Sequence, residues 1–253
     1  MSTDDIIIRL FLIVDERLGN CKKRSDAGLY VSEIVTIGLL AALKGKRFAA
    51  FYRWLKANYG YWFPKLPEHS RLSRLLSDYS ELADEFLAAP SFFTVLDPIG
   101  IELIHPRREG RSKKQIGKKG ISNGRWIVGI KLAWLINDRG EVVDWAWDTA
   151  DAPDNVFRDL ALLYNGKTIT LTDQGLRERG APPSNLKHCE RGKWNERFTI
   201  ETNYSWLTEF FDAKKLYHRT TKHLTAHLRY LAALFNCLLQ ITDGKRSLAD
   251  FVI

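Results

Sequence analysis

The chain has 253 residues, of which 45% are hydrophobic, 12% aromatic and 27% charged. This composition can supply a sizeable buried core, and it excludes a disordered, collagen-like or low-complexity chain. Lys and Arg number 38 against 30 Asp and Glu, and the resulting formal net charge of +8 favours a polyanionic partner.

The cysteines and the apolar stretches indicate the cellular compartment of the protein. The three cysteines are far apart and lack CxxC spacing, which is typical of reduced intracellular thiols rather than of a disulfide framework or a zinc site. The most apolar stretches, residues 6–14 and 34–43, are too short to span a membrane as helices. Asp4 and Asp5 give the N-terminus the wrong charge for a signal peptide. We therefore expect a soluble cytoplasmic protein.

Helical periodicity dominates the first ninety residues. Apolar side chains recur every three or four residues in four stretches, which polar loops and glycines separate. The expected helices lie at residues 7–14, 34–43, 48–59 and 71–86. The last of them opens after Ser70, a residue type that favours a helix N-terminus. The pattern predicts a small all-helical domain, residues 1–90.

From residue 91 the pattern changes to strand spacing. Strand-forming residues run from Phe92 to Leu96, and two longer runs are joined by Asp138-Arg139-Gly140, a strong hairpin signal. The elements expected in this part are strands at 92–96, 125–137, 141–147 and 167–171 and helices at 154–164, 196–212 and 224–241. This order predicts a second domain, residues 91–253, with an α/β fold in which helices flank a mixed sheet.

Two aspartates lie where predicted strands end. If those strands are parallel neighbours, Asp97 and Asp173 emerge at the same carboxyl edge of the sheet, where α/β folds bind ligands. Two close carboxylates repel each other unless a cation compensates them, and Mg²⁺ prefers oxygen ligands. Glu201, at the border of the apolar stripe of its helix, is the best candidate for a third ligand. Arg197, one turn earlier, can steady Glu201 or contact a phosphate.

The same residues also have a simpler interpretation. An aspartate after a strand is usually a turn former or a helix cap, and a Glu four residues after an Arg is usually part of a surface ion pair. Asp144, Asp148, Asp151 and Asp154 are rival carboxylates, and Asp154 suits the N-cap of the helix that follows it. Composition and spacing alone leave the metal site as one hypothesis among these.

Three segments around the acidic residues match a known pattern in the same order. They are Val95-Leu96-Asp97-Pro98, Leu171-Thr172-Asp173-Gln174-Gly175-Leu176, and Arg197-Phe198-Thr199-Ile200-Glu201-Thr202 followed by Leu207. They resemble the first-strand aspartate, the D-x-G-[YF] element and the R-x-x-I-E-x-x-F-x-x-L helix of bacterial insertion-sequence transposases of the DDE class. Within this class the chain is similar to the insertion-sequence family numbered nine hundred and eighty-two, and residues 31–36 and 63–72 resemble the leader domain of such enzymes.

The resemblance implies a ribonuclease-H-like fold for residues 91–253, with two Mg²⁺ ions, or Mn²⁺ as a substitute, bound by Asp97, Asp173 and Glu201. The implied activity is that of a DNA transposase, which cuts transposon ends and joins the 3′-hydroxyl to target DNA by two-metal phosphoryl transfer. Residues 1–90 then correspond to a leader domain that binds DNA ends. The implied partners are double-stranded DNA, as element ends and as target at the nucleoid, and by analogy a second copy in a homodimer on DNA.

Three positions depart from the family pattern. Pro98 and Leu176 stand where the family often has Ser and Tyr, and Thr208 stands where related enzymes carry a phosphate-binding Lys. Trp194, in register with a tyrosine of those enzymes, can still stack on a base. All three acidic positions are present, so the departures bear on efficiency more than on identity. The 27 residues between the second and the third acidic residue leave no room for the sizeable subdomain that several transposases insert there.

Clusters of basic residues suit a DNA-binding surface. Residues 107–120 carry seven positive charges against one negative, which is compatible with a plain solvated loop and with phosphate binding beside the acidic residues. Arg71 and Arg74 lie three residues apart on the fourth predicted helix. This spacing suits a helix docked against a DNA groove, and equally an ordinary solvent-exposed face. The predicted DNA-binding residues are Arg71, Arg74, Arg107, Arg108, Arg111, Lys113, Lys114, Lys118, Lys119, Lys193, Trp194 and Arg197.

Two other functions are open to a chain with this pattern. A domesticated, inactive DNA-binding protein would keep the fold without the reaction, although the retained acidic residues argue against it. A ribonuclease-H-like nuclease would hydrolyse DNA without joining strands, and a strand-transfer assay separates it from a transposase.

Overall fold

The computed structural model divides the chain into two compact units. It describes residues 1–23, 25, 27–45, 47–122, 124–176, 183–189 and 197–244. The helical unit comprises Met1–Phe86, Phe210–Asp212 and Thr221–Ile253, and the sheet unit comprises Leu87–Glu209 and Ala213–Thr220. Each unit therefore combines segments that are distant in the sequence.

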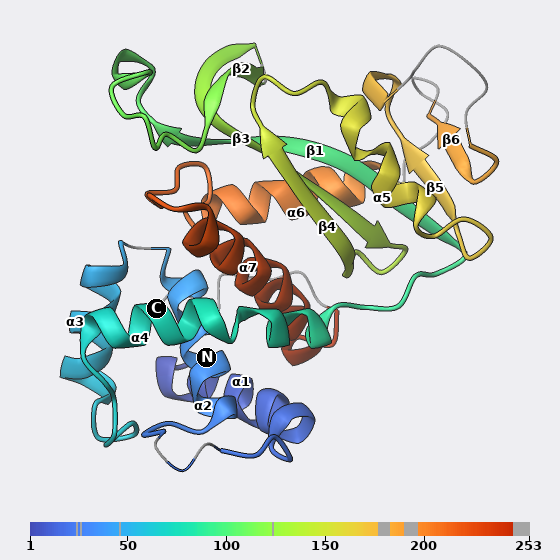
Figure 1. The fold of residues 1–253 in the computed structure, drawn as a ribbon. Coiled ribbons are helices and arrows are strands. Elements are labelled where there is room, and N and C mark those ends of the chain that lie inside the picture. The colour runs from blue at the N-terminus through green and yellow to red at the C-terminus, as the bar shows by residue number, and fades with distance from the viewer. Residues whose placement is uncertain are drawn as a thin grey trace. The chain divides into compact units, whose positions relative to one another are not determined.

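The helical unit contains the predicted helices of the N-terminal region. Its elements are α1 (Thr3–Leu18), α2 (Val31–Lys44), α3 (Phe48–Tyr59), α4 (His69–Asp78), the 3₁₀ helix η1 (Ser80–Phe86) and α7 (Thr221–Ile241), as Figure 1 shows. Ser2 begins α1 with a capping box, because its hydroxyl accepts a hydrogen bond from the Asp5 N–H (3.1 Å) and the Asp5 carboxylate accepts one from the Ser2 N–H (3.1 Å). None of the helices in the described ranges is long and apolar enough to cross a membrane.

The predicted helix over residues 71–86 is in fact two elements. Its α-helical part begins at His69 with Glu68 as N-cap, so the start predicted after Ser70 is wrong, and it ends at Asp78. Serine hydroxyls bond to the backbone at the break, since Ser80 Oγ donates to the carbonyl oxygen of Ser77 (3.0 Å). Such local side-chain bonds compete with the helical ladder, which explains why a 3₁₀ helix follows.

The last helix of the chain completes the helical unit. The apolar side of α7 is buried against α2, α4 and η1. The Tyr230 hydroxyl donates to the carbonyl oxygen of Leu76 (2.9 Å), and the Asn236 amide donates to that of Phe86 (2.9 Å). In the structure, α7 thus belongs to the same compact unit as the N-terminal helices. The division into a DNA-end-binding domain, residues 1–90, and a catalytic domain, residues 91–253, stays a prediction.

The sheet unit has the predicted α/β architecture, a mixed sheet flanked by helices. The strands are β1 (Phe93–Ile104), β2 (Lys118–Ser122), β3 (Arg125–Asn137), β4 (Val142–Thr149), β5 (Ile169–Thr172) and β6 (Leu186–His188). Their order is β2-β3-β1-β5-β6, with β4 also paired to β3. The β1–β3, β2–β3 and β3–β4 pairs are antiparallel, whereas β1, β5 and β6 are parallel.

Strand β1 is longer than the sequence predicts. The prediction ends the strand at Leu96, but β1 continues through Asp97 and Pro98 to Ile104. Only its pairing with β5 ends early, because Leu96–Thr172 is the last parallel pair while β3 stays paired up to Ile104. A proline is tolerated at this point because β5 has ended on that edge, so the missing N–H costs no bond to β5.

Strands β2 and β6 had not been predicted as separate elements. β2 lies at the end of the basic run 107–120 and contains two lysines and a glycine, which are poor strand formers. Its conformation comes from pairing with β3, a non-local interaction that the local pattern does not reveal. β6 has three residues and lies in the short interval between the second and third acidic positions, parts of which lie outside the described residues.

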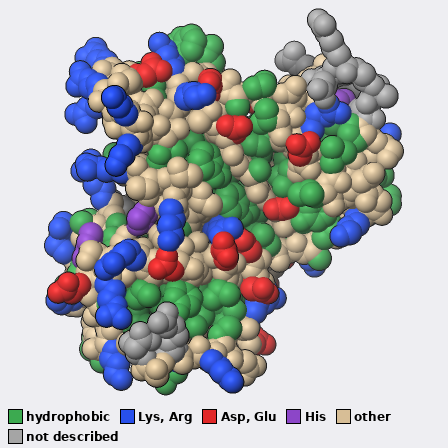
Figure 2. Space-filling view, viewed as in Figure 1, with side chains coloured by type: hydrophobic (Ala, Val, Ile, Leu, Met, Phe, Trp, Pro, Cys, Tyr) green, Lys and Arg blue, Asp and Glu red, His purple; other side chains and the backbone are tan. Residues whose placement is uncertain are grey.

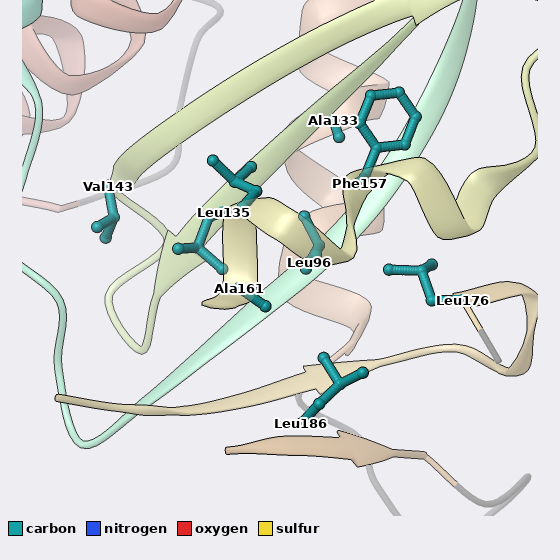
Figure 3. Packing of buried hydrophobic residues seen from close by; sticks show 9 residues of the cluster. Leu96, Ala133, Leu135, Val143, Phe157, Ala161, Leu176 and Leu186 are labelled. Atoms are coloured by element: carbon teal, nitrogen blue, oxygen red, sulfur yellow. The ribbon is translucent and has the colours of Figure 1, made fainter. Parts of the chain in front are cut away.

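Helices cover both faces of the sheet. The remaining elements are η2 (Pro106–Arg108), η3 (Asp154–Phe157), α5 (Arg158–Leu162), η4 (Gln174–Leu176) and α6 (Arg197–Glu209). Figure 3 shows the core between the sheet and α5, which consists of Leu96, Ala133, Leu135, Val143, Phe157, Leu160, Ala161, Leu176 and Leu186. Neighbouring strand residues point to opposite faces, so Leu96 faces this core and Asp97 faces α6, which packs on β1.

Candidate functional site

Asp97 and Asp173 lie side by side where β5 ends. β1 and β5 are parallel neighbours, as expected, and their register pairs Leu96 with Thr172. Asp97 and Asp173 are the next residues of the two strands, one step beyond a ladder whose strands are spaced about 4.8 Å apart. Both side chains are half-buried. The register therefore brings together two of the three acidic residues that the sequence singles out.

Hydrogen bonds hold the turn that carries Asp173. Its Oδ1 atom accepts a hydrogen bond from the N–H of Gly175 (2.8 Å), and this bond stabilises a turn directly after β5. Its carbonyl oxygen lies 3.0 Å from Nδ1 of His188, a residue of β6 that pairs with Thr172. Because a carbonyl oxygen only accepts, this bond requires a proton on Nδ1 of His188. The neighbouring strand thus supports the backbone of the second aspartate.

A further carboxylate, that of Asp154, lies close to Asp173. A Cβ added at Gly175 would lie 3.1 Å from Oδ1 of Asp173 and 3.3 Å from Oδ2 of Asp154, so a side chain there would crowd both carboxylates. Lys131 of β3 balances the charge of Asp154 with an Nζ–Oδ1 distance of 2.7 Å, and its Nζ also donates to the carbonyl oxygen of Ala152 (2.6 Å). The Lys131 side chain is only 15% exposed, which makes this ion pair a largely buried one.

The contacts of Asp154 show that its predicted role as an N-cap is wrong, and they add Lys131 to the residues around the candidate site. The N-cap of η3 is Pro153, and Asp154 is the first residue of that helix, so the predicted capping role is wrong. Its carboxylate instead forms the ion pair with Lys131, a residue that was not among the predicted site residues. A lysine within the otherwise apolar stretch of β3 was the available signal, since a buried charge needs a partner.

Tyr204 connects α6 to the strands that carry the first aspartate. Its hydroxyl donates to the carbonyl oxygen of Asp97 and accepts the N–H of Trp134 (3.0 Å), the residue opposite Asp97 on β3. Burial, and after it the negative charge of Asp97, raises the pKa of Tyr204 well above its ordinary value. The hydroxyl therefore stays protonated and keeps its donor role. This contact fixes one turn of α6 at the position of Asp97.

Glu201 lies on that same part of α6, three residues before Tyr204, and its side chain is exposed. Residues three apart lie on one side of a helix, so the Tyr204 anchor also limits where Glu201 can be. Within the described ranges, however, no three His, Cys, Asp or Glu side chains are grouped closely enough to hold a metal ion. The structure therefore brings Asp97 and Asp173 together, but does not place Glu201 in one ligand set with them.

The donor atoms nevertheless suit one class of ion. Asp97 and Asp173 offer carboxylate oxygens, which are the ligands that Mg²⁺ and Mn²⁺ prefer. No protein-family model matches this chain, and no curated protein matches it.

The rival carboxylates have local partners. Asp144 accepts a hydrogen bond from the Tyr164 hydroxyl (3.2 Å). Burial raises the pKa of Asp144 above its ordinary value. Burial, and after it the negative charge of Asp144, raises the pKa of Tyr164 to about 12. Asp148 accepts from the Thr149 N–H (2.6 Å), and Asp151 accepts from the Thr149 hydroxyl (2.6 Å). These contacts are the turn and strand interactions expected of structural aspartates.

Residues 107–120, the basic segment, expose every one of their Lys and Arg side chains. Figure 2 shows Lys and Arg gathered at the end of the sheet that carries the loop between β1 and β2. The loop is tied internally, because Gln115 accepts from the Gly110 N–H (2.9 Å) and donates to the carbonyl oxygen of Gly117 (2.6 Å). Such exposure is compatible with a solvated loop and with phosphate binding, so the DNA contacts stay predictions.

Little of this positive charge is neutralised by the protein itself. Lys118 lies 3.3 Å from Asp151 in an exposed ion pair, with side-chain exposures of 65% and 42%. Exposed pairs of this kind stabilise a protein by about 0–1 kcal/mol and are easily exchanged for another anion. The five basic residues of the segment that precede Lys118 make no ion pair with any described residue.

The other predicted DNA contacts lie in the helical unit and at the start of α6. Arg71 and Arg74 are exposed on α4, on the side away from the buried Leu72. This position is compatible with a DNA contact and with an ordinary solvent face, so the assignment stays a prediction. Lys193 and Trp194 lie outside the described residues, as does the side chain of Arg197, the residue at which α6 begins.

Proposed function

We propose that this protein is a bacterial insertion-sequence transposase of the DDE class that acts on double-stranded DNA. The observation that supports it best is the strand register, which sets Asp97 beside Asp173 although 75 residues separate them in the sequence. Both come from motif segments of the resemblance, and the third segment forms α6, which Tyr204 ties to the backbone of Asp97.

The sheet supports the ribonuclease-H-like fold as part of the same proposal. Three antiparallel strands, β1, β3 and β4, are followed by a helical crossover to β5, which returns parallel to β1. The candidate carboxylates lie at the edge where parallel strands end, the usual ligand-binding edge of an α/β sheet. Helix α6 then covers the face to which Asp97 points.

Asp97 and Asp173, with Glu201 from α6, would hold the metal. When bound there, Mg²⁺ ions supply an activated water or 3′-hydroxyl nucleophile and stabilise the leaving oxygen. The protein's own residues position this site: His188 and Gly175 fix the Asp173 turn, and Tyr204 fixes Asp97 relative to α6. The exposed basic segment would hold the phosphate backbone by releasing counterions, which gives binding without sequence preference.

Two other functions compete with this proposal. The exposed position of Glu201 and the lack of a grouped third ligand in the described part favour an inactive DNA-binding protein. A ribonuclease-H-like nuclease needs the same two aspartates, and differs only in that it does not join strands. The proposed substrate would place the protein in the cytoplasm, at the nucleoid.

One experiment separates the three functions. The full chain is incubated with DNA carrying the genomic sequences that flank its own gene, a circular target plasmid and Mg²⁺, and every product end is mapped. A transposase cuts at defined element ends and joins the 3′-hydroxyl to the plasmid. A nuclease yields cut but unjoined ends, and an inactive binding protein leaves the DNA intact, so either result would reject the proposal.

A further inference from the structure

The β2–β3 hairpin exposes a large aromatic side chain that the DDE motifs do not include. Trp126 is 59% exposed, and Ile121, directly opposite it on β2, is 54% exposed. Exposing a tryptophan beside an isoleucine on the surface is unfavourable, because the apolar area of both side chains stays in contact with water. Covering the two side chains with a partner would remove this area from water and would be favourable. Such a pair on a short hairpin therefore indicates a binding surface.

The hairpin has one packed face and one open face. A Cβ added at Gly100 of β1 would lie 2.3 Å from Oγ of Ser122 and 2.9 Å from Cδ1 of Ile127, so the face that carries Ser122 and Ile127 packs against β1. Neighbouring residues of a strand point to opposite faces. Ile121 and Trp126 consequently belong to the open face, and the fold of the sheet unit does not bury them.

The open face is basic as well as apolar. The Lys119 ammonium lies 5.0 Å from the centroid of the Trp126 ring, at cation–π distance. The basic segment, whose Lys and Arg side chains are all exposed, runs directly into β2. An apolar ring surrounded by positive charge complements an anionic partner with flat π surfaces, and matches neither a neutral peptide nor a membrane interior.

We propose that Trp126, with Ile121 and Lys119, forms a stacking platform for an unpaired base of a DNA strand. The inference rests on the proposed function, because it adds a contact for the single-stranded DNA that cutting and joining create. The ring would stack on the base while Lys119 binds the adjoining phosphate. Stacking of this kind accepts any base, and duplex DNA cannot use it without unpairing.

The test measures binding of the full chain, in Ca²⁺, to a labelled thymidine strand of about 20 nucleotides and to a blunt duplex of the same length. Trp126→Ala should weaken single-strand binding about 5- to 150-fold and leave blunt-duplex binding unchanged. Its salt slope should stay as in the wild type, since the ring carries no charge. Lys119→Ala should instead lower the single-strand salt slope by about 0.7.

Matched variants keep the result interpretable. Trp126→Phe retains a stacking ring and should restore most of the affinity, which separates stacking from a folding defect. Phe92→Ala removes a side chain of the sheet unit that is 80% exposed but is absent from the platform, and it should bind like the wild type. Equal losses for the single strand and the duplex, or no loss with Trp126→Ala, would overturn the inference.

The outcomes also separate this inference from the proposed function. A wild-type chain that binds neither DNA would reject both. A wild-type chain that binds the duplex and cuts element ends with Mg²⁺, while Trp126→Ala keeps full single-strand affinity, would reject the platform alone.

Discussion

Asp97 and Asp173 are held by different kinds of interaction. The position of Asp97 depends on strand pairing on both sides of Leu96 and on the Tyr204 hydroxyl, which bonds to the backbone of Asp97 and of Trp134. The position of Asp173 depends on its own turn and on His188. Glu201 is carried by α6, and its side chain is exposed. The first two residues are thus the most pre-organised part of the candidate site.

Neutralising the candidate ligands should abolish the reaction. Asp97→Asn, Asp173→Asn and Glu201→Gln should each remove Mg²⁺-dependent cleavage while DNA binding and thermal melting stay close to the wild type, because an amide lacks the charge that holds the cation. The double variants should be scarcely worse than the single ones, since the ligands act as a unit. Single-turnover cleavage measures this. Asp148→Asn, which alters a carboxylate of strand β4 that accepts a hydrogen bond from the Thr149 N–H, is the control and should cleave normally. Full activity in any of the three variants would remove that residue from the site.

Tyr204→Phe should reduce catalysis more than binding. The change deletes a buried hydroxyl that bridges β1, β3 and α6, at a cost in unfolding free energy of about 1–2 kcal/mol. A displacement of about 1 Å at Asp97 can lower the cleavage rate roughly a hundredfold, whereas DNA affinity depends on other surfaces. Urea unfolding and cleavage at saturating DNA separate the two effects. Tyr61→Phe alters an exposed tyrosine and serves as the control. A folded Tyr204→Phe variant that cleaves at the wild-type rate would show that the hydroxyl does not position Asp97.

Among the elements, the basic segment and β2 form a continuous unit. The loop over residues 107–117 is held by Gln115 rather than by an apolar core, and β2 continues it as a strand beside β3. Its charge is therefore presented on a backbone that is fixed at both ends, by β1 and by β2. A flexible tail with the same charge would lose more conformational entropy on binding DNA.

Neutralising this unit should weaken DNA binding without changing its sequence preference. With Lys113, Lys114, Lys118 and Lys119 all replaced by Gln, the affinity for unrelated duplexes should fall by similar factors. The salt slope should fall by about 0.9 for each lysine that contacts a phosphate. Binding titrations at several salt concentrations measure this, with Lys167→Gln as the control on another part of the sheet unit. An unchanged slope would return the segment to the status of a solvated loop.

Local patterns predicted the elements whose stability is local. Helix α3 and the long strands of the β3–β4 hairpin were found at or close to their observed bounds, because apolar periodicity and the Asp138-Arg139-Gly140 turn determine them. The single helices predicted over 71–86 and 154–164 are instead each made of an α-helix and a 3₁₀ helix, α4 with η1 and α5 with η3. β2 and the second half of β1 were missed because cross-strand pairing creates them. In the site, the motifs gave the neighbouring aspartates, whereas Lys131 and Tyr204 emerge only from tertiary contacts.

At the scale of the whole molecule, the chain returns to the helical unit after completing the sheet unit. Strand and helix patterns show where each element lies, but not which helices share a core, because α7 is as compatible with a sheet face as with a helical bundle. The hydrogen bonds from α7 to the carbonyl oxygens of Leu76 and Phe86 show that this helix packs in the helical unit. The predicted leader domain, residues 1–90, therefore lacks one wall of its core when it is taken alone.

A chain of residues 1–90 should consequently fail to fold. Without α7 the apolar sides of α2 and α4 stay in water, and a helical domain of this size has little stability to spare. Urea unfolding followed by circular dichroism should show no cooperative transition. The same segment joined through a Gly/Ser linker to residues 221–253 should regain one. Cooperative unfolding of residues 1–90 alone would contradict this account of the helical unit.

We propose that Asp97, Asp173 and Glu201 form an oxygen-only site for a divalent cation, with which the protein cuts DNA. The most direct measurement is cleavage of the flanking-end substrate in EDTA, Ca²⁺, Mg²⁺ and Mn²⁺ in parallel. We expect no cleavage in EDTA, binding without cleavage in Ca²⁺, whose longer bonds misalign the nucleophile, cleavage in Mg²⁺, and cleavage with relaxed specificity in Mn²⁺. Cleavage that persists in EDTA would contradict the claim.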